Sequence, residues 1–210
     1  MGLVLACLCG PASAAAQPSL LASETKLTAS DGAASDQFGL GLALEGDTAA
    51  VGAAQNGPGA VYVYDRDSGG PGKWGEVKKL VASGLVDDFG ATVSISGDTL
   101  AVRSDGDGIY IFERDVGGPD NWGEVTKFGG TFSGDLALDG DTLIAGDVDT
   151  ALIYVRDVGG GDNWGQIKLI TAASVGTVIN SAFGIRVSID RDTAAVAATA
   201  DSRPDPSTGA

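Results

Sequence analysis

Acidic side chains provide most of the chemistry that this sequence could perform. The chain of 210 residues contains 28 Asp and Glu residues and no histidine. The lack of histidine excludes Ser-His-Asp triads, Cys-His dyads, His-ligated zinc and histidine proton shuttles. Two acidic pairs recur at corresponding turn positions: Asp105 with Asp107, and Asp147 with Asp149. These four carboxylates are candidates for a weak cation or polar-ligand site; the alternative is an acidic turn whose Asp and Gly residues serve turn geometry.

Arginine and tryptophan also recur at fixed intervals. The arginines, each followed by Asp, are Arg66, Arg114 and Arg156, and the tryptophans are Trp74, Trp122 and Trp164. The guanidiniums could form a ring that binds anions, and the indoles could be platforms for sugars. We favour a structural interpretation, in which Arg–Asp or Arg–Trp contacts fix each loop and the indoles pack.

Enzymatic chemistry would have to rest on carboxylates alone, as in glycoside hydrolysis. Nearly all Asp and Glu residues recur with a repeat or lie in turns, and no unique pair stands out. A catalytic site normally interrupts a repeat, so we expect no catalytic residue, no enzymatic activity and no cofactor. A carbohydrate-active enzyme whose active end lies partly in further repeats is the alternative.

The overall charge limits the choice of partners. The formal net charge is −15, whereas nucleic acids and anionic membranes need a basic surface to neutralise phosphate. Apolar residues make up 43% of the chain, which is enough to form a core. We therefore expect a folded protein with a protein or glycan ligand, no nucleic-acid partner and no membrane span.

The N-terminus has the features of a secretory signal peptide. An apolar run at Leu3–Leu8 precedes small residues that fit an A-x-A cleavage site, which predicts a signal peptide over residues 1–16. Both cysteines, Cys7 and Cys9, lie inside it, so the mature chain would contain no sulfur nucleophile and no disulfide. A buried N-terminal strand or helix and a lipoprotein signal are the alternatives. Localisation is expected to be extracellular or at the cell surface.

The positions that could do chemistry belong to an internal repeat. The markers of its copies are Phe38, Gly39, Trp74, Phe89, Gly90, Trp122, Phe132, Trp164, Phe183 and Gly184. Successive Phe markers are 51, 43 and 51 residues apart, and successive Trp markers 48 and 42. Such regular spacing indicates copies of one structural unit.

Each copy contains four short strand-like segments. In the first copy these are 38–44, 48–53, 60–64 and 74–80, and the third is apolar on both faces. No segment shows a sustained helical period, so we expect very little helix. Four antiparallel strands repeated every 40–50 residues indicate an all-β fold of β-propeller blades, and a β-sandwich is the weaker alternative.

The markers resemble those of the FG-GAP repeat family, to which the blades of integrin α-subunit propellers belong. The resemblance rests on the three Phe-Gly pairs, on Val51-Gly52-Ala53 and on the Arg-Asp-x-Gly-Gly-x-x-x-Trp-Gly-Glu loops, and it covers residues 21–200. It implies blades at roughly 31–82, 83–128 and 129–171, with a partial blade at 177–200. It also implies an extracellular binding or adhesion scaffold.

The resemblance further implies calcium in the hairpin that follows the Phe-Gly strand. Calcium takes six to eight oxygen ligands. Here the hairpins are cut to Glu45-Gly46-Asp47 and its counterparts at 96–98, 139–141 and 190–192, which carry few carboxylates. We expect calcium binding to be lost at these turns.

The number of repeats suggests an incomplete ring. About three and a half blades are present, and residues 201–210 are a polar, Pro-rich tail or truncation point. The segment Thr25–Thr28 resembles the fourth strand of a preceding blade. We expect either the N-terminal part of a longer product or a truncated gene, and unpaired blade edges could lead to self-association.

Overall fold

The chain folds into a series of small antiparallel sheets. The computed structural model describes residues 3–6, 24–84, 87–177 and 182–199, and of residues 3–6 only the backbone. The first complete sheet, blade 1, consists of β3 (Phe38–Glu45), β4 (Thr48–Ala53), β5 (Ala60–Asp65) and β6 (Gly75–Leu80), in that spatial order. All its neighbouring strands are antiparallel.

Two further sheets repeat this plan. Blade 2 consists of β7 (Asp87–Ser96), β8 (Thr99–Asp105), β9 (Gly108–Arg114) and β10 (Trp122–Gly129). Blade 3 consists of β11 (Leu136–Asp139), β12 (Thr142–Asp147), β13 (Thr150–Val155) and β14 (Gly165–Thr171). The all-β class and the four-stranded antiparallel blades predicted from the sequence are thus confirmed.

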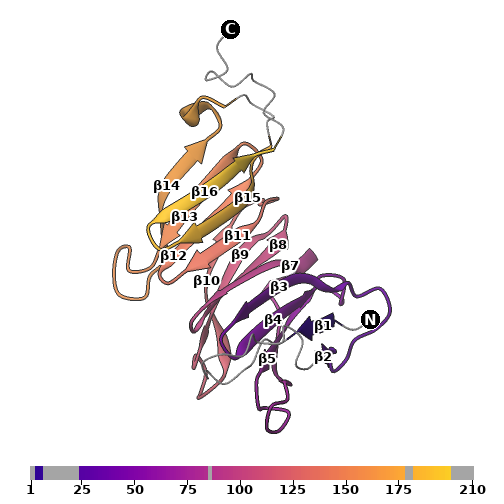
Figure 1. Cartoon of the computed structure of the whole chain (residues 1–210). Coiled ribbons are helices and arrows are strands. Elements are labelled where there is room, and N and C mark those ends of the chain that lie inside the picture. Colours follow the sequence, from indigo (N-terminus) through magenta and orange to yellow (C-terminus); the bar gives the residue numbers. More distant parts are fainter. Residues whose placement is uncertain (1–2, 7–23, 85–86, 178–181, 200–210) are drawn as a thin grey trace, which may run out of the picture.

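Shorter sheets lie at the two ends of the stack (Figure 1). One pairs β1 (Leu3–Ala6) with β2 (Glu24–Leu27), and the other, the half-blade, pairs β15 (Phe183–Asp190) with β16 (Thr193–Ala198). Among the described residues the one helical element is a 3-10 turn, η1 (Ala173–Val175). Most of the predicted signal peptide, with Cys7 and Cys9, and the tail at 201–210 lie outside the described residues.

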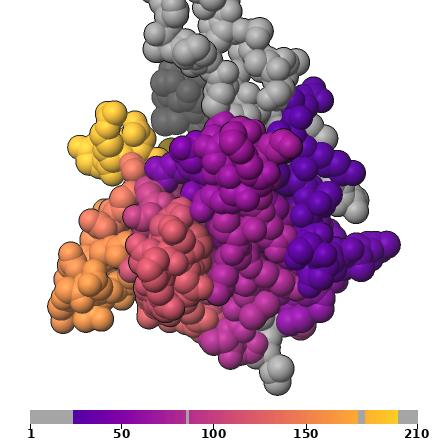
Figure 2. Space-filling view, turned by 90° about the horizontal axis from the view of Figure 1, so that it is seen from below, coloured from indigo at the N-terminus to yellow at the C-terminus, as the bar shows by residue number. Residues whose placement is uncertain are grey.

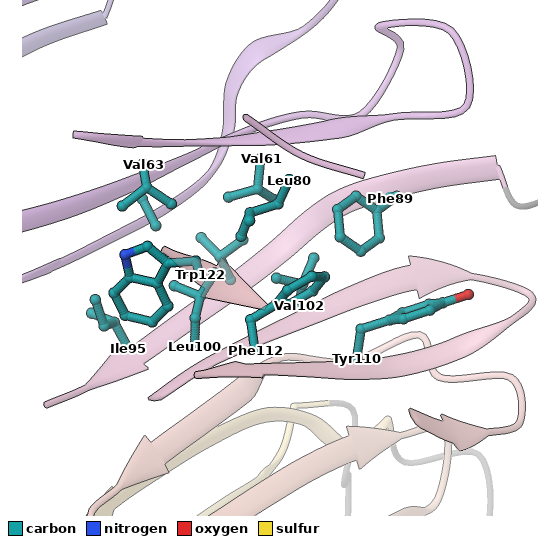
Figure 3. Close-up of a cluster of buried hydrophobic side chains, with 12 residues drawn as sticks. Val61, Val63, Leu80, Phe89, Ile95, Leu100, Val102, Tyr110, Phe112 and Trp122 are labelled. Atoms are coloured by element: carbon teal, nitrogen blue, oxygen red, sulfur yellow. The ribbon is translucent and has the colours of Figure 1, made fainter. Parts of the chain in front are cut away.

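Consecutive sheets pack face to face, because strand three of each blade has apolar side chains on both faces. In β5, Val61 and Val63 pack toward blade 2, whereas Tyr62 and Tyr64 pack toward β2 on the opposite side. Figure 3 shows Val61, Val63 and Leu80 of blade 1 meeting the apolar side chains of blade 2. Similar clusters join blade 2 to blade 3, and blade 3 to the half-blade. The sheets therefore follow one another in sequence order, as the colours in Figure 2 show.

Strand β2 occupies the place of an outer strand. Leu27 packs on the face of blade 1 as Leu80 packs on the face of blade 2. The hydroxyl of Ser30 donates to Glu76 at 2.8 Å, and the hydroxyl of Ser83 donates to Glu124 at 2.9 Å. Each serine lies three residues after the packed leucine, so β2 matches the fourth strand that the sequence predicted.

The Phe-Gly pair bends the first strand toward the preceding sheet. Gly39, Gly90 and Gly184 have φ angles of 96°, 95° and 93°, which glycine adopts without strain. The pairing register shifts around the Phe-Gly pair in each of these strands, at a β-bulge: between Phe38 and Leu42, between Asp87 and Thr92, and between Phe183 and Val187. The bulge brings the carbonyl oxygen of Gly90 against Gly52 of blade 1, where a Cβ would overlap it. Gly184 lies against Gly146 of blade 3 in the same way.

The junction between blades 2 and 3 differs at both of these positions. Blade 2 has Arg103 where its neighbours have Gly52 and Gly146, and blade 3 has Ser133 where its neighbours have the glycine of Phe-Gly. The Arg103 guanidinium donates to the carbonyl oxygen of Phe132 at 2.6 Å. Phe132 remains buried, but strand β11 begins only at Leu136. Arg103 therefore contacts the carbonyl group that links Phe132 to Ser133, so the two changed positions adjoin each other across this junction.

Burial depends on the neighbouring sheets as well as on the sequence of a strand. Strands β4 (TAAVGA) and β16 (TAAVAA) differ at one residue. Every residue of β4 is buried, whereas Thr193, Ala194 and Ala195 of β16 are exposed. In the described chain β4 lies between two strands and two sheets, while β16 pairs only with β15.

Candidate functional site

An arginine, an aspartate and a tryptophan form the same cluster in each complete blade. In blade 2, Nε of Arg114 lies 3.0 Å from the carboxylate of Asp98, and the guanidinium lies 4.9 Å from the ring centroid of Trp122. Arg66 with Asp47 and Trp74, and Arg156 with Asp141 and Trp164, repeat the arrangement. The Asp–Arg and Arg–Trp contacts proposed from the sequence as alternatives therefore occur together.

The arginine of one blade also holds the preceding blade. Arg114 donates to Asp65 at 3.1 Å and to the hydroxyl of Thr48 at 2.7 Å, both in blade 1. Arg156 likewise donates to Glu113 and Thr99 of blade 2. Burial opposes the charged form of Arg114, but the hydrogen bonds and charges of Asp65 and Asp98 outweigh it and raise its pKa.

These contacts leave the arginines little freedom to bind anions and the tryptophans little surface to bind sugars. The guanidiniums of Arg114 and Arg156 are each shared between carboxylates of two blades. The three indoles are buried against the sheets rather than presented on the surface. The arrangement supports the structural interpretation of both sets of residues.

The four acidic candidates lie at the opposite end of the blades, where strand two turns into strand three. Asp105 is held by Arg103 at 2.5 Å. Asp107 accepts hydrogen bonds from Lys127 at 2.7 Å and from the hydroxyl of Tyr110. In blade 3, Asp147 accepts a hydrogen bond of 2.8 Å from the Ser133 hydroxyl. Asp149 lies in the adjoining turn with a left-handed φ of 60°.

The structure does not gather these carboxylates into a metal site. Among the described residues there is no group of three or more Asp, Glu, His or Cys side chains that could hold a metal ion. The hairpin carboxylates of Asp47, Asp98 and Asp141 are directed to arginines. Loss of calcium binding at these turns stays a prediction.

The N-terminal part of this arrangement matches a known family. Residues 22–64 match the model of the FG-GAP repeat. This segment is similar to an FG-GAP repeat. The match covers β2 to β5, including Phe38-Gly39 and the contact glycine Gly52, and so confirms the resemblance for residues 22–64 of the 21–200 over which the sequence suggested it.

No curated protein matches the sequence. A solved structure of a europium-containing methanol dehydrogenase aligns with 61% of this chain and 23% of that chain, at 13% sequence identity and a TM-score of 0.43. Within the described ranges, no helix is long and apolar enough to cross a membrane.

A polar triad of Asp, Tyr and Lys, which was not predicted from the sequence, occurs in blades 1 and 2. In blade 1, the Tyr62 hydroxyl and the Lys79 ammonium donate to the two carboxylate oxygens of Asp31, at 2.5 Å and 2.6 Å. In blade 2, Tyr110 and Lys127 hold Asp107 in the same way. The tyrosine and lysine are cross-strand partners in both blades. Blade 3 has Leu152 opposite Leu169 at these positions, so a paired Tyr–Lys pattern was the available signal.

The triads change the acidity of their members. Hydrogen bonds from Lys79 and Tyr62 lower the pKa of the Asp31 carboxyl. Lys127 and Tyr110 lower the pKa of Asp107 in the same manner. Burial and the neighbouring carboxylate raise the pKa of Tyr110. Each triad therefore holds an ionised carboxylate between a tyrosine hydroxyl and a lysine side chain, an arrangement suited to fixing a turn.

A small pocket adjoins the blade 1 triad. It has a volume of about 170 Å³ and lies beside the segment that joins β2 to β3. Its lining residues are Lys26, Thr28, Ala29, Gly32, Ala33, Asp36 and Phe38. The Asp36 carboxylate accepts hydrogen bonds from the Ala33 amide at 2.6 Å and from Asn56 at 2.8 Å. These bonds direct Asp36 to the loop that forms the pocket wall.

Proposed function

We propose that this chain is part of a secreted, non-catalytic β-propeller scaffold that binds a protein or glycan through one end of its blades. We call this the loop end; it carries the connections between strands two and three and the segments that join successive sheets. The opposite, turn end carries the strand one–two turns and the loops before the tryptophans. The observation that carries this proposal is that all three complete blades repeat the same side chains at the turn end, whereas at the loop end the strand two–three connection of blade 1 differs from those of blades 2 and 3.

At the turn end, the repeated side chains make contacts within and between the blades, and these contacts are sufficient to explain why they recur. Each complete blade uses an arginine, an aspartate and a tryptophan to fix its long loop, and two of the arginines also tie neighbouring blades together. A side chain needed once per blade for packing recurs once per blade. This end therefore supports a structural role.

At the loop end, blade 1 differs from blades 2 and 3 in chemistry and in length. The strand two–three connection carries Gln55 and Asn56 in blade 1, Asp107 in blade 2 and Asp149 in blade 3. Its length also differs, from six residues between β4 and β5 to two between the corresponding strands of blades 2 and 3. Loops that vary on a rigid scaffold are the usual place for ligand recognition, which supports a binding role for this end.

The non-catalytic part of the proposal rests on how the carboxylates are held. Asp105 pairs with an arginine, and Asp107 with a lysine and a tyrosine. A general acid needs a raised pKa near the working pH. The pKa of Asp107 is instead lowered by its partners. The secreted part rests on the sequence of residues 1–16.

The test is binding by the full chain as released into the medium, with its N-terminus sequenced to locate the cleavage site. A glycan array and immobilised extracellular-matrix proteins are the probes. We expect binding without turnover, and a loss of binding in a loop-end variant, Asp105→Asn. The matched control is Asp162→Asn at the turn end, where the side chain is also exposed; it should bind like the wild type.

Three results would overturn the proposal. Equal binding by both variants and the wild type would remove the loop end as the binding surface. A chain that stays inside the cell with residues 1–16 still attached would contradict secretion. Turnover of a bound glycan that disappears on neutralising one aspartate would instead support the carbohydrate-active alternative.

A further inference from the structure

The first strand of blade 1 exposes a row of leucines. Leu40, Leu42 and Leu44 alternate along β3 and are 54%, 47% and 49% exposed. Their neighbours Gly41 and Ala43 face blade 2 instead. We call the surface formed by Leu42, Leu44 and the Phe38-Gly39 pair the leading face of blade 1; Phe38 is buried there in a cluster with Leu27 of β2, whereas the two leucines are exposed.

The equivalent residues of blades 2 and 3 are buried. They are Val93 and Ile95 in blade 2, and Leu136 and Leu138 in blade 3. Each pair packs in the cluster that joins its blade to the one before it. The internal junctions therefore show what covers a leading face: the opposite, trailing face of another FG-GAP sheet.

A hydrogen bond accompanies this packing at each internal junction. The amide of Gly97 donates to the Glu45 carboxylate, and the amide of Gly140 donates to the Ser96 hydroxyl at 2.9 Å. The amide of Arg191 donates to the Asp139 carboxylate. Gly46 of blade 1 is equivalent to the donors Gly97 and Gly140. Asp190 of the half-blade is equivalent to the acceptors Glu45, Ser96 and Asp139, and its side chain is 82% exposed.

These features would let the half-blade of a second copy cover blade 1, but one residue does not fit. A leading Phe-Gly pair places its carbonyl oxygen where a side chain on strand two of the preceding sheet would be. At Gly52 and Gly146 a Cβ would overlap the oxygen of Gly90 or Gly184. The half-blade has Ala197 at this position.

The blade 2–blade 3 junction shows what happens when that glycine is missing. With Arg103 on strand two, the next sheet has Ser133 in place of the Phe-Gly glycine and a shortened first strand. Blade 1 retains Gly39, with a φ angle of 96°, and a full-length first strand. Its leading face therefore has the form that requires glycine opposite.

We propose that the leading face of blade 1 accepts an FG-GAP sheet with glycine at the fifth position of its second strand, and that Ala197 keeps the half-blade of a second copy off this face. The leading face thus accepts only a partner sheet whose strand-two residue at this position has no Cβ. This inference is independent of the ligand at the loop end.

The test uses the full chain and five variants: Leu42→Glu, Ala197→Gly, Ala197→Ser, Ala197→Gly with Leu42→Glu, and Ala197→Ser with Leu42→Glu. Sedimentation velocity measures self-association over a range of concentrations. We expect Ala197→Gly to associate at least about tenfold more tightly than the wild type, because the overlap is relieved. Ala197→Ser, which keeps a Cβ, should behave like the wild type.

Mixing experiments test the direction of the contact. The Ala197→Gly/Leu42→Glu chain has an open trailing face and a blocked leading face, so it should form a one-to-one complex with the wild type. The Ala197→Ser/Leu42→Glu chain should form none. In the first complex, hydrogen exchange of the Gly46 amide of the wild-type chain should slow, since it gains the Asp190 acceptor.

Two results would overturn the inference. One is equal self-association of the wild type, Ala197→Gly and Ala197→Ser, each with an unchanged circular dichroism spectrum. The other is a wild-type oligomer that Leu42→Glu dissociates, because the half-blade would then cover blade 1 despite Ala197.

Discussion

The carbonyl oxygen of Gly90 occupies the space that a side chain at Gly52 would need. This contact joins the first strand of blade 2 to the second strand of blade 1, and it recurs between Gly184 and Gly146. In this chain the glycine of Phe-Gly and the strand-two glycine are thus two halves of one inter-blade contact.

Gly52→Ala should destabilise the chain. The new Cβ would meet backbone atoms, which cannot rotate away, so blades 1 and 2 must separate. We expect the free energy of unfolding to fall by about 1–3 kcal/mol. Urea denaturation followed by tryptophan fluorescence measures it. Gly161→Ala is the control, because a Cβ there would meet nothing within 4 Å; equal losses in the two variants would contradict the contact.

Arg114 should couple blade 1 to blade 2 energetically. Its ion pair with Asp65 spans the junction, and both side chains are mostly buried. A double-mutant cycle with Arg114→Ala and Asp65→Asn should give a coupling energy of about 1 kcal/mol, because the pair is shielded from water only in part. Arg191→Ala, whose side chain is 86% exposed, should leave stability nearly unchanged. A coupling energy within about 0.3 kcal/mol of zero would show that the junction does not need the pair.

Asp107 should contribute a pH-dependent part of the stability. Lys127 and Tyr110 lower its pKa below the usual 3.8 in the folded state. Its contribution is therefore present above the unfolded-state pKa and is lost as the pH falls through the lower, folded-state pKa. Asp107→Asn should be less stable than the wild type at pH 7.

The difference between these two proteins should shrink as the solution is acidified below pH 4, which thermal denaturation across that range would show. Asp162→Asn, at an exposed site, should give a small difference without this trend. A difference between Asp107→Asn and the wild type that stays constant with pH would contradict the assignment.

Calcium should not stabilise the folded chain through its strand one–two turns. The carboxylates of Asp47, Asp98 and Asp141 are paired with arginines, and each turn is too short to supply six oxygen ligands. Calorimetric titration with calcium chloride should show no tight, stoichiometric uptake. A tight site saturated a hundredfold above its Kd would add about 2.7 kcal/mol to the free energy of unfolding. A rise in melting temperature on adding calcium, reversed by chelation, would contradict this prediction.

Much of the fold could be predicted because it depends on local patterns. Strand β4 was predicted with the observed bounds, since its apolar run ends at turn residues on both sides. The buried faces of β5 followed from its unbroken apolar sequence. The contacts of Arg66, Arg114 and Arg156 were only partly foreseen. Their intervals from Asp and Trp were visible, but the Asp65 and Thr48 partners of Arg114 lie in another blade.

The candidate site could be predicted less well, because its partners come from segments far apart in the chain. The acidic turn at Asp107 was recognised, but its bonds to Tyr110 and Lys127 were not. In blade 1 the equivalent pair, Tyr62 and Lys79, holds Asp31. Asp31 comes from the segment between β2 and β3, not from a strand two–three connection. No single spacing relates the two acids, so the sequence could not place both in one kind of triad.

The sequence alone determined that strands repeat, where they turn, and which positions have no side chain. Those properties depend on hydrophobic period and backbone freedom, which are local. Only the tertiary structure decided which strand-two residue meets which Phe-Gly pair, and that Arg103 lies against the carbonyl group between Phe132 and Ser133. It also decided that TAAVGA is buried in β4 while the nearly identical β16 is exposed, because burial depends on the sheets that pack against a strand.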